Sequence, residues 1–202
     1  MAPVDVLVLC TGNQCRSPMG EALLHHRLAA AGIDAHVHSA GLVSEGVPAS
    51  AHGVRALAKR GVDLGAHRSR ALTPEMVAQA DLVIGMAREH VREAVALRPE
   101  AFPRTFTLRE LVRRAGAVGP RRPVPGADPG ADALEPLDAW LARVSAGRRP
   151  TDLLGEHPGD DVADPMGMSR RAYERCATDI EDLVEGLVDL AFPVRRSRSY
   201  SA

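Results

Sequence analysis

The sequence predicts an α/β domain, a three-layer αβα sandwich built around a four-stranded parallel sheet. Short apolar runs alternate along the chain with segments that carry helix signals, and helices between successive strands imply right-handed βαβ crossovers. A length of 202 residues, of which 45% are hydrophobic, suits one domain with a well-buried core. We therefore expect a single domain over residues 1–192.

The strands are predicted where short apolar runs end at turn residues. Val4 to Cys10 is such a run, and Thr11-Gly12-Asn13 ends it. Ser17 is expected to cap the next helix, with Pro18 at its first position, because this order is typical of helix N-termini. The other predicted strands cover residues 36–40, 81–86 and 104–107, and the other predicted helices cover residues 50–60, 137–145 and 169–190.

The last helix has a single apolar stripe, which predicts that it packs on the sheet. The stripe consists of Tyr173, Cys176, Ile180, Leu183, Leu187 and Leu190. Between this helix and the predicted strands, residues 116–136 are rich in Pro, Gly, Ala and Asp, which predicts a loop or linker. Residues 193–202 form a basic tail that we expect to be disordered.

Charge and cysteine content exclude several classes of partner. The net charge is −1, so no general attraction to nucleic acid or to a membrane surface is expected. No apolar stretch is long enough to cross a membrane, and the run Val6 to Leu9 is too short for a signal peptide. Three cysteines do not form a disulfide framework, and a reactive thiol suits a reducing compartment, so we expect a cytoplasmic protein.

The loop after the first strand has the residues of an oxyanion site. Backbone N–H groups in a loop between a strand and a helix form an anion nest, to which the helix adds the positive end of its dipole. A thiol held there, such as Cys10, is deprotonated more easily than a free cysteine. Arg16 follows six positions later, and its planar guanidinium can bind two phosphoryl oxygens. The pattern indicates transfer of a phosphoryl group to the sulfur of Cys10.

Two other interpretations of these residues are open. Cys10 could be a small buried residue in an ordinary βα turn. Cys10 and Cys15 could be half of a metal site, although no second Cys/His pair stands at ligand spacing. His36 and His38 would lie on one face of a strand, but no third ligand is apparent. We therefore predict no metal ion and no other cofactor.

Residues 8–19, VLCTGNQCRSPM, resemble the signature of the low-molecular-weight protein tyrosine phosphatase family. The similarity continues through residues 39–41 and 81–86 to Asp164-Pro165, and residues 116–160 look like an insertion relative to compact members. The resemblance implies hydrolysis of a phosphate monoester in two steps. A cysteine thiolate attacks phosphorus to form a phosphocysteine, and an Asp-Pro aspartate acts first as acid and then as base.

The resemblance assigns these roles to Cys10 and Asp164. Asp128-Pro129 is a competing dipeptide, but no helix follows it directly. The phosphate would be surrounded by Thr11, Gly12, Asn13, Gln14, Cys15 and Arg16. The loop would be held by a hydrogen-bond network of Asn13, Ser17, Ser39 and His67. Cys15 would protect Cys10 by a reversible disulfide, or it is simply a small packed residue.

The positions that select the substrate differ from those of tyrosine-selective members. Asp164-Pro165 is followed by Met166-Gly167-Met168 instead of aromatic residues, and residues 42–48 contain none. Gln14 stands where an aliphatic residue is usual. Trp140 lies in the insertion and Tyr173 on the predicted core stripe, so neither is an obvious replacement for the missing aromatic wall.

Phosphotyrosine in proteins is the substrate expected by family, and a small-molecule phosphate ester, covered by the insertion as a lid, is the alternative. Protein phosphoarginine ranks third. An arsenate reductase would need further cysteines after the third strand, and residues 87–97 contain none. A non-catalytic phosphate-binding module would be expected to lack Cys10, Arg16 or the acid, all of which are present. The sequence does not indicate an oligomeric state.

Overall fold

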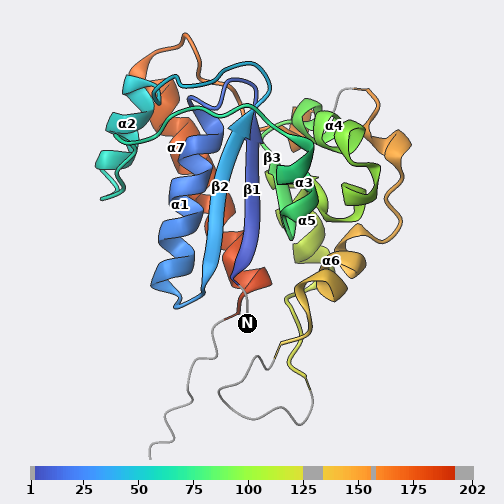
Figure 1. Ribbon diagram of the computed structural model, residues 1–202. Coiled ribbons are helices and arrows are strands. Elements are labelled where there is room, and N and C mark those ends of the chain that lie inside the picture. Colours follow the sequence, from blue (N-terminus) through green and yellow to red (C-terminus); the bar gives the residue numbers. More distant parts are fainter. Residues whose placement is uncertain (1–2, 125–133, 156–157, 194–202) are drawn as a thin grey trace, which may run out of the picture.

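A sheet of four strands, all parallel, forms the middle layer of the protein (Figure 1). The structure is a computed structural model that describes residues 3–124, 134–155 and 158–193. The strands, in the spatial order β2-β1-β3-β4, are β1 (Val4–Cys10), β2 (Ala35–Gly41), β3 (Leu82–Gly85) and β4 (Thr105–Thr107). The predicted four-stranded parallel sheet with flanking helices is confirmed.

The α-helices cover both faces of this sheet. They are α1 (Arg16–Ala30), α2 (Ala51–Ala58), α3 (Pro74–Gln79), α4 (Arg88–Leu97), α5 (Leu108–Val118), α6 (Leu137–Ser145) and α7 (Arg170–Ala191). Short 3₁₀ turns are η1 (Pro99–Arg104), η2 (Pro150–Leu153) and η3 (Pro158–Asp160). None of the helices in the described ranges is long and apolar enough to cross a membrane.

Alternation along β1 divides the core into two parts. Val6 and Val8 face the larger cluster, which includes residues of α1 and α7, whereas Leu7 and Leu9 face the cluster of α3 and α4. All four side chains are buried, as expected for a central strand of a parallel sheet that is covered on both faces. Because β1 lies between β2 and β3, its carboxyl end opens into the crevice where such sheets bind ligands.

The apolar stripe of α7 was predicted correctly. Tyr173, Cys176, Ile180 and Leu187 are buried. Leu183 and Leu190 are partly buried against the larger cluster, to which Val6 and Val8 belong. The helix runs beside α1 and α5, so the stripe closes the core on that side.

The start of α1 differs from the prediction. The helix begins at Arg16, and its N-cap position is Cys15, which makes no side-chain capping bond. Ser17 is therefore inside the first turn and is not a cap. Its hydroxyl donates instead to the sulfur of Cys10, a tertiary contact that competes with the local capping preference.

The described part of the insertion packs into the domain. The helix predicted at 137–145 is confirmed as α6, whereas the loop predicted from residue 116 begins later, because α5 continues to Val118. Trp140 is fully buried and donates its indole N–H to the carbonyl of Gly119 at 3.0 Å. Residues 125–133, with Asp128-Pro129, and most of the predicted tail lie outside the described residues.

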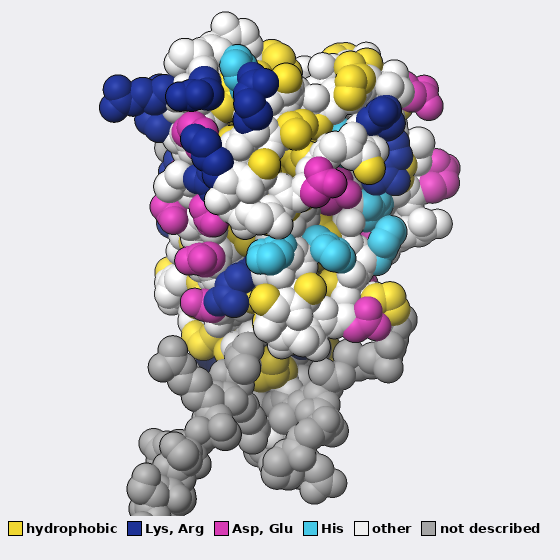
Figure 2. Space-filling model, turned by 90° about the vertical axis from the view of Figure 1, so that its left-hand side faces the viewer, with side chains coloured by type: hydrophobic (Ala, Val, Ile, Leu, Met, Phe, Trp, Pro, Cys, Tyr) yellow, Lys and Arg dark blue, Asp and Glu magenta, His cyan; other side chains and the backbone are white. Residues whose placement is uncertain are grey.

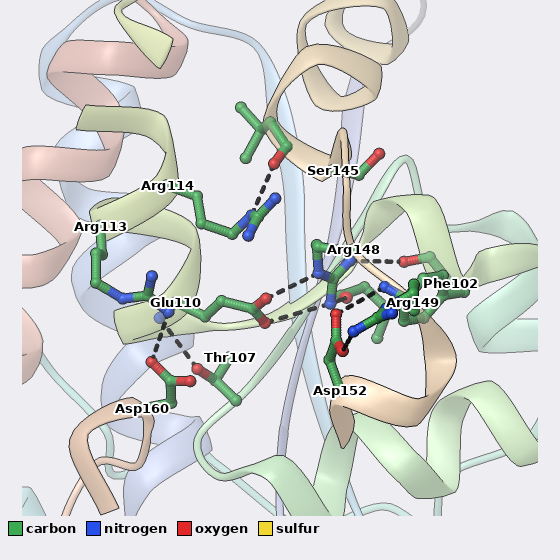
Figure 3. A network of polar contacts seen from close by, with 12 residues as sticks. Phe102, Thr107, Glu110, Arg113, Arg114, Ser145, Arg148, Arg149, Asp152 and Asp160 are labelled. Carbon is green, nitrogen blue, oxygen red and sulfur yellow. Dashed lines mark hydrogen bonds and ion pairs between the residues drawn. The ribbon is translucent and has the colours of Figure 1, made fainter. Parts of the chain in front are cut away.

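A buried arginine fastens the segment after α6 to the sheet (Figure 3). Arg148 pairs with Glu110 of α5 at 2.8 Å and donates to the carbonyl oxygens of Phe102 and Thr105. Its guanidinium also lies 4.0 Å from the ring centroid of Phe106. A buried charge with this many partners indicates that the described part of this stretch is integral to the fold.

Candidate functional site

The candidate site is the loop that joins β1 to α1. Cys10 is the last residue of β1, and Arg16 is the first residue of α1. Within the part of the chain that the structure describes, the backbone N–H groups of residues 12–16 donate to no protein acceptor. Free amides at a helix N-terminus are the donors that an oxyanion accepts from, so the loop can bind a phosphoryl group.

Asn13 is the centre of the network that shapes this loop. It is fully buried and has a φ of 49°, in the left-handed region that Asn tolerates better than most residues. Its amide Nδ2 donates to Ser17 Oγ at 3.0 Å and to Ser39 Oγ at 2.7 Å. Its carbonyl oxygen lies 2.8 Å from His67 Nε2. The structure thus brings together all four residues that the resemblance placed in a supporting network.

The network reaches the sulfur of Cys10 through Ser17. The hydroxyl of Ser17 lies 3.0 Å from Cys10 Sγ and donates to it. A hydroxyl donor and a helix N-terminus both direct positive charge toward the sulfur, which is the environment of reactive cysteines. At the other end, Ser39 donates to the carboxylate of Glu21 at 2.5 Å. Glu21 was not recognised in the sequence, because only the fold places α1 beside β2.

Gly41 is a second site residue that sequence reasoning missed. A Cβ atom built on Gly41 would lie 2.8 Å from the backbone nitrogen of Asn13 and 2.9 Å from the carbonyl oxygen of Thr11. These are backbone atoms that cannot yield without moving the loop. The end of β2 therefore has to be glycine so that the loop can rest directly on it.

Arg16 links the loop to a distant segment that carries Asp164. Its guanidinium donates to Asp164 Oδ2 at 2.6 Å and to the carbonyl oxygen of Val162 at 3.2 Å. The segment is itself fixed, because Val162 N–H donates to the carbonyl oxygen of Met86, the residue that follows β3. Arg16 is buried, while the Asp164 side chain is 43% exposed, so its carboxyl group can reach a substrate that enters from solvent.

His90 holds the near side of the loop. Its Nδ1 accepts from Ala87 N–H at 2.8 Å, so its Nε2 carries the proton and donates to Thr11 Oγ1 at 3.0 Å. Burial, with the nearby Arg16 charge, lowers the pKa of His90 to about 3. A neutral imidazole agrees with these contacts, although Glu89 is close enough to pair with a charged ring. His90 gave no signal in the sequence beyond its place after a predicted strand.

The thiols differ in character. Cys10, Cys15 and Cys176 are all free and buried. Burial, with the nearby Cys176, raises the pKa of Cys15 far above that of free cysteine, and burial raises the pKa of Cys176 to about 12. Both are therefore protonated at neutral pH. Cys10, with its serine donor, is the candidate nucleophile.

A pocket of about 570 Å³ opens beside Arg16 and Asp164. Its lining includes Thr11 of the loop, Arg88 and Arg92 of α4, and Gly155 of the insertion. The insertion thus borders the site, and residues 152–153 accept hydrogen bonds from α4 through their carbonyl oxygens.

Exposed aliphatic side chains lie on the two segments in which aromatic residues were sought. Val43 and Val47 lie after β2, and Met166 and Met168 follow Asp164, with exposed fractions from 37% to 72%. Figure 2 shows hydrophobic side chains beside arginine and lysine at the upper end of the molecule, where the strands terminate. Trp140 and Tyr173 are both buried, so neither supplies an aromatic wall. We name Val43, Val47, Met166 and Met168 the aliphatic rim.

A possible metal-binding cluster lies elsewhere on the sheet. Atoms of Asp5, His36 and His38 that can ligate a metal all lie within 4.8 Å of one another. Asp5 supplies the third potential ligand, which was not apparent in the sequence because it comes from the neighbouring strand.

Three features together define a cysteine-based phosphatase. They are the parallel sheet, the Cys-x5-Arg loop at its carboxyl edge, and the aspartate that pairs with Arg16. A family model described as low molecular weight phosphotyrosine protein phosphatase matches residues 5–125. The low molecular weight protein-tyrosine-phosphatase Etp of Escherichia coli is 37% identical over 142 residues, which cover 70% of this chain and 89% of Etp. The chain therefore belongs to the low molecular weight phosphotyrosine protein phosphatase family and is a phosphoric monoester hydrolase of that type.

Two further similarities bear on the fold and the substrate. The crystal structure of a low molecular weight protein tyrosine phosphatase from T. tengcongensis has a TM-score of 0.66 and 31% identity, and the match covers 92% of this chain and 98% of the other. The protein-arginine-phosphatase of Bacillus subtilis is 37% identical over 110 residues, 54% of this chain and 73% of that protein. These similarities favour a phosphatase over an arsenate reductase or a non-catalytic module.

Proposed function

We propose that this protein hydrolyses phosphotyrosine in proteins, with Cys10 as nucleophile, Arg16 as phosphate ligand and Asp164 as acid and base. In the first step Cys10 Sγ forms a bond to phosphorus while the bond to the leaving oxygen breaks, and the Asp164 carboxyl gives its proton to that oxygen. In the second step the Asp164 carboxylate takes a proton from water. The water oxygen then bonds to phosphorus, the sulfur–phosphorus bond breaks, and phosphate leaves.

Arg16 links binding of the phosphate to release of the Asp164 carboxyl group from its ion pair. The guanidinium that pairs with Asp164 at 2.6 Å is also the one that would grip two phosphoryl oxygens. A dianionic phosphate competes with the carboxylate for these donors. In this proposal, the phosphoryl group takes over the guanidinium and Asp164 becomes available to the leaving oxygen.

The remaining loop residues position the phosphate in this proposal. The backbone N–H groups of residues 12–16, which include those of Gly12, Gln14 and Cys15, donate to the equatorial oxygens of the phosphoryl group. The negative charge on these oxygens grows in the transition state. Ser17, Ser39 and His67 hold the loop through Asn13. Residues 1–192 then form one phosphatase domain, with residues 116–160 as an insertion whose described part packs into it.

The aliphatic rim is the observation that carries the choice of substrate. Four exposed aliphatic side chains around a phosphate site offer apolar contact to an aromatic ring and to a protein surface, whereas a polar metabolite would leave them in water. Two relatives whose matches cover 70% of the chain, one from Escherichia coli and one from Ralstonia solanacearum, are named low molecular weight protein-tyrosine-phosphatase, the second as probable. A bound phosphotyrosine ring would pack between Val43 and Met166.

The catalytic roles are tested with Cys10→Ser and Asp164→Asn. We expect Cys10→Ser to abolish turnover of every ester, since the weaker nucleophile cannot form the phosphocysteine. Asp164→Asn should lower kcat for a phosphotyrosine peptide by about 10²–10⁴-fold. The same change should matter less for para-nitrophenyl phosphate, because its acidic leaving group needs less protonation. Equal losses on both substrates would contradict the role of Asp164 as acid.

The substrate is tested by replacing the rim. The double variant Val43→Ser with Met166→Ser should raise KM for a phosphotyrosine peptide and leave kcat for para-nitrophenyl phosphate nearly unchanged. Leu97→Ser, an exposed apolar residue at the end of α4, is the matched control. Faster hydrolysis of phosphoarginine or of a small phosphate ester than of phosphotyrosine peptides by the wild type would refute the proposed substrate.

A further inference from the structure

Asp5, His36 and His38 converge on one face of the sheet. Asp5 on β1 is the register partner of His36 on β2, and His38 follows two residues later on the same face. His36 Nδ1 lies 2.7 Å from Asp5 Oδ2, and His38 Nε2 lies 2.9 Å from Asp5 Oδ1. The two imidazole rings stack with centroids 4.7 Å apart. Three donor atoms of the kinds that bind transition metals are thus already gathered.

The cluster is open to solvent but well supported. β2 is the edge strand of the sheet, and Figure 1 shows no helix in front of it. The side chain of His38 is 10% exposed, that of Asp5 24% and that of His36 59%. The two inner groups are therefore held by packing, while the outer imidazole leaves a path for an ion and for water.

The donor set of the cluster suits a divalent cation. A single carboxylate faces two imidazole nitrogens, and the three groups contact one another directly. Each of them can act as an electron-pair donor to an ion bound between them. Two imidazoles with one carboxylate suit Zn²⁺ and its neighbours among the first-row metals better than Mg²⁺ or Ca²⁺.

We propose that Asp5, His36 and His38 form a binding site for a divalent transition-metal ion such as Zn²⁺, with a fourth position open to water. The ion is bound through His36 Nδ1, His38 Nε2 and the Asp5 carboxylate. It lies outside the phosphatase machinery, because Cys10 stands five positions after Asp5 along extended β1, a distance of about 16 Å. By joining the edge strand to β1 the ion stabilises the folded state, since the unfolded chain does not hold these ligands together.

The test measures Zn²⁺ binding by isothermal titration calorimetry with the full chain in the Cys10→Ser background. That background is needed because an active-site thiolate is itself a zinc ligand. We expect one ion per chain and a rise in melting temperature with added Zn²⁺. His36→Ala, at an exposed position that the fold tolerates, should weaken binding by at least about tenfold and remove the rise. Asp5→Asn should do the same.

A matched control is available on α1. His25 and His26 are exposed neighbours, and Figure 2 shows that histidines are frequent on that face. The double variant His25→Ala with His26→Ala should leave the Zn²⁺ affinity unchanged. Unaltered affinity in His36→Ala, or binding weaker than about 1 mM in the parent, would overturn the proposal and leave the cluster as a hydrogen-bonded group of one carboxylate and two imidazoles.

Discussion

Replacement of Asn13 tests whether one buried side chain holds the catalytic loop. In Asn13→Ala three hydrogen bonds disappear: those to Ser17 Oγ, to Ser39 Oγ and from Arg70 N–H to Asn13 Oδ1. Each bond contributes about 1 kcal/mol, and the buried partners that are left unsatisfied add to the loss. The free energy of unfolding should therefore fall by about 3–5 kcal/mol.

The backbone at Asn13 makes a further contribution that glycine avoids. At a φ of 49° alanine is strained by about 1–2 kcal/mol, whereas glycine is not. Glycine also lowers the free energy of unfolding by about 0.4–1 kcal/mol, because it makes the unfolded chain more flexible. We therefore expect Asn13→Gly to lose the same hydrogen bonds but to be more stable than Asn13→Ala by about 1 kcal/mol.

Both variants are compared with the wild type by urea unfolding under reducing conditions, together with kcat/KM for para-nitrophenyl phosphate. Activity should fall in both, because the amides of the loop and Cys10 Sγ lose their support. Two results would refute the reasoning. A loss of less than about 1 kcal/mol in Asn13→Ala would mean that the network does not hold the loop. Equal stability of the two variants would mean that the backbone is not strained.

Three other predictions concern residues outside that network. Gly41→Ala should lower kcat at least about tenfold, because its Cβ would displace the loop backbone; unchanged kcat would contradict this. Trp140→Ala should lower the free energy of unfolding in urea by about 3–5 kcal/mol, and the exposed control Leu154→Ala by less than about 0.5 kcal/mol. Equal small losses in the two variants would show that the insertion does not share the core. His90 has a pKa lowered to about 3, so it stays neutral in the fold while the unfolded chain takes up a proton below pH 6.5. Stability is then fully present above pH 6.5 and falls as the pH drops toward 3, by roughly 2 kcal/mol between pH 6.5 and 5. His90→Gln should lack this component, and identical pH dependence of unfolding in both proteins would disprove it.

Much of the loop was predictable because its residues are neighbours in the chain. A strand, a turn and a helix start within residues 4–18 place Cys10 and Arg16 at the same helix N-terminus, and that geometry depends only on local backbone preferences. The strands and the stripe of α7 were predicted for a similar reason, since the period of apolar residues reports which face is buried.

Long-range contacts were decided by the tertiary structure alone. Nothing local connects Arg16 with Asp164, which lies 148 residues away; the family resemblance suggested the aspartate, and the packing of its loop on β3 brings it there. Asp5 became a potential metal ligand only when β1 and β2 paired. Ser17 shows the competition between local sequence preference and tertiary contacts. Its sequence context favours a helix cap, but the approach of the Cys10 sulfur offers its hydroxyl a tertiary partner, and that partner exists only after the chain has folded.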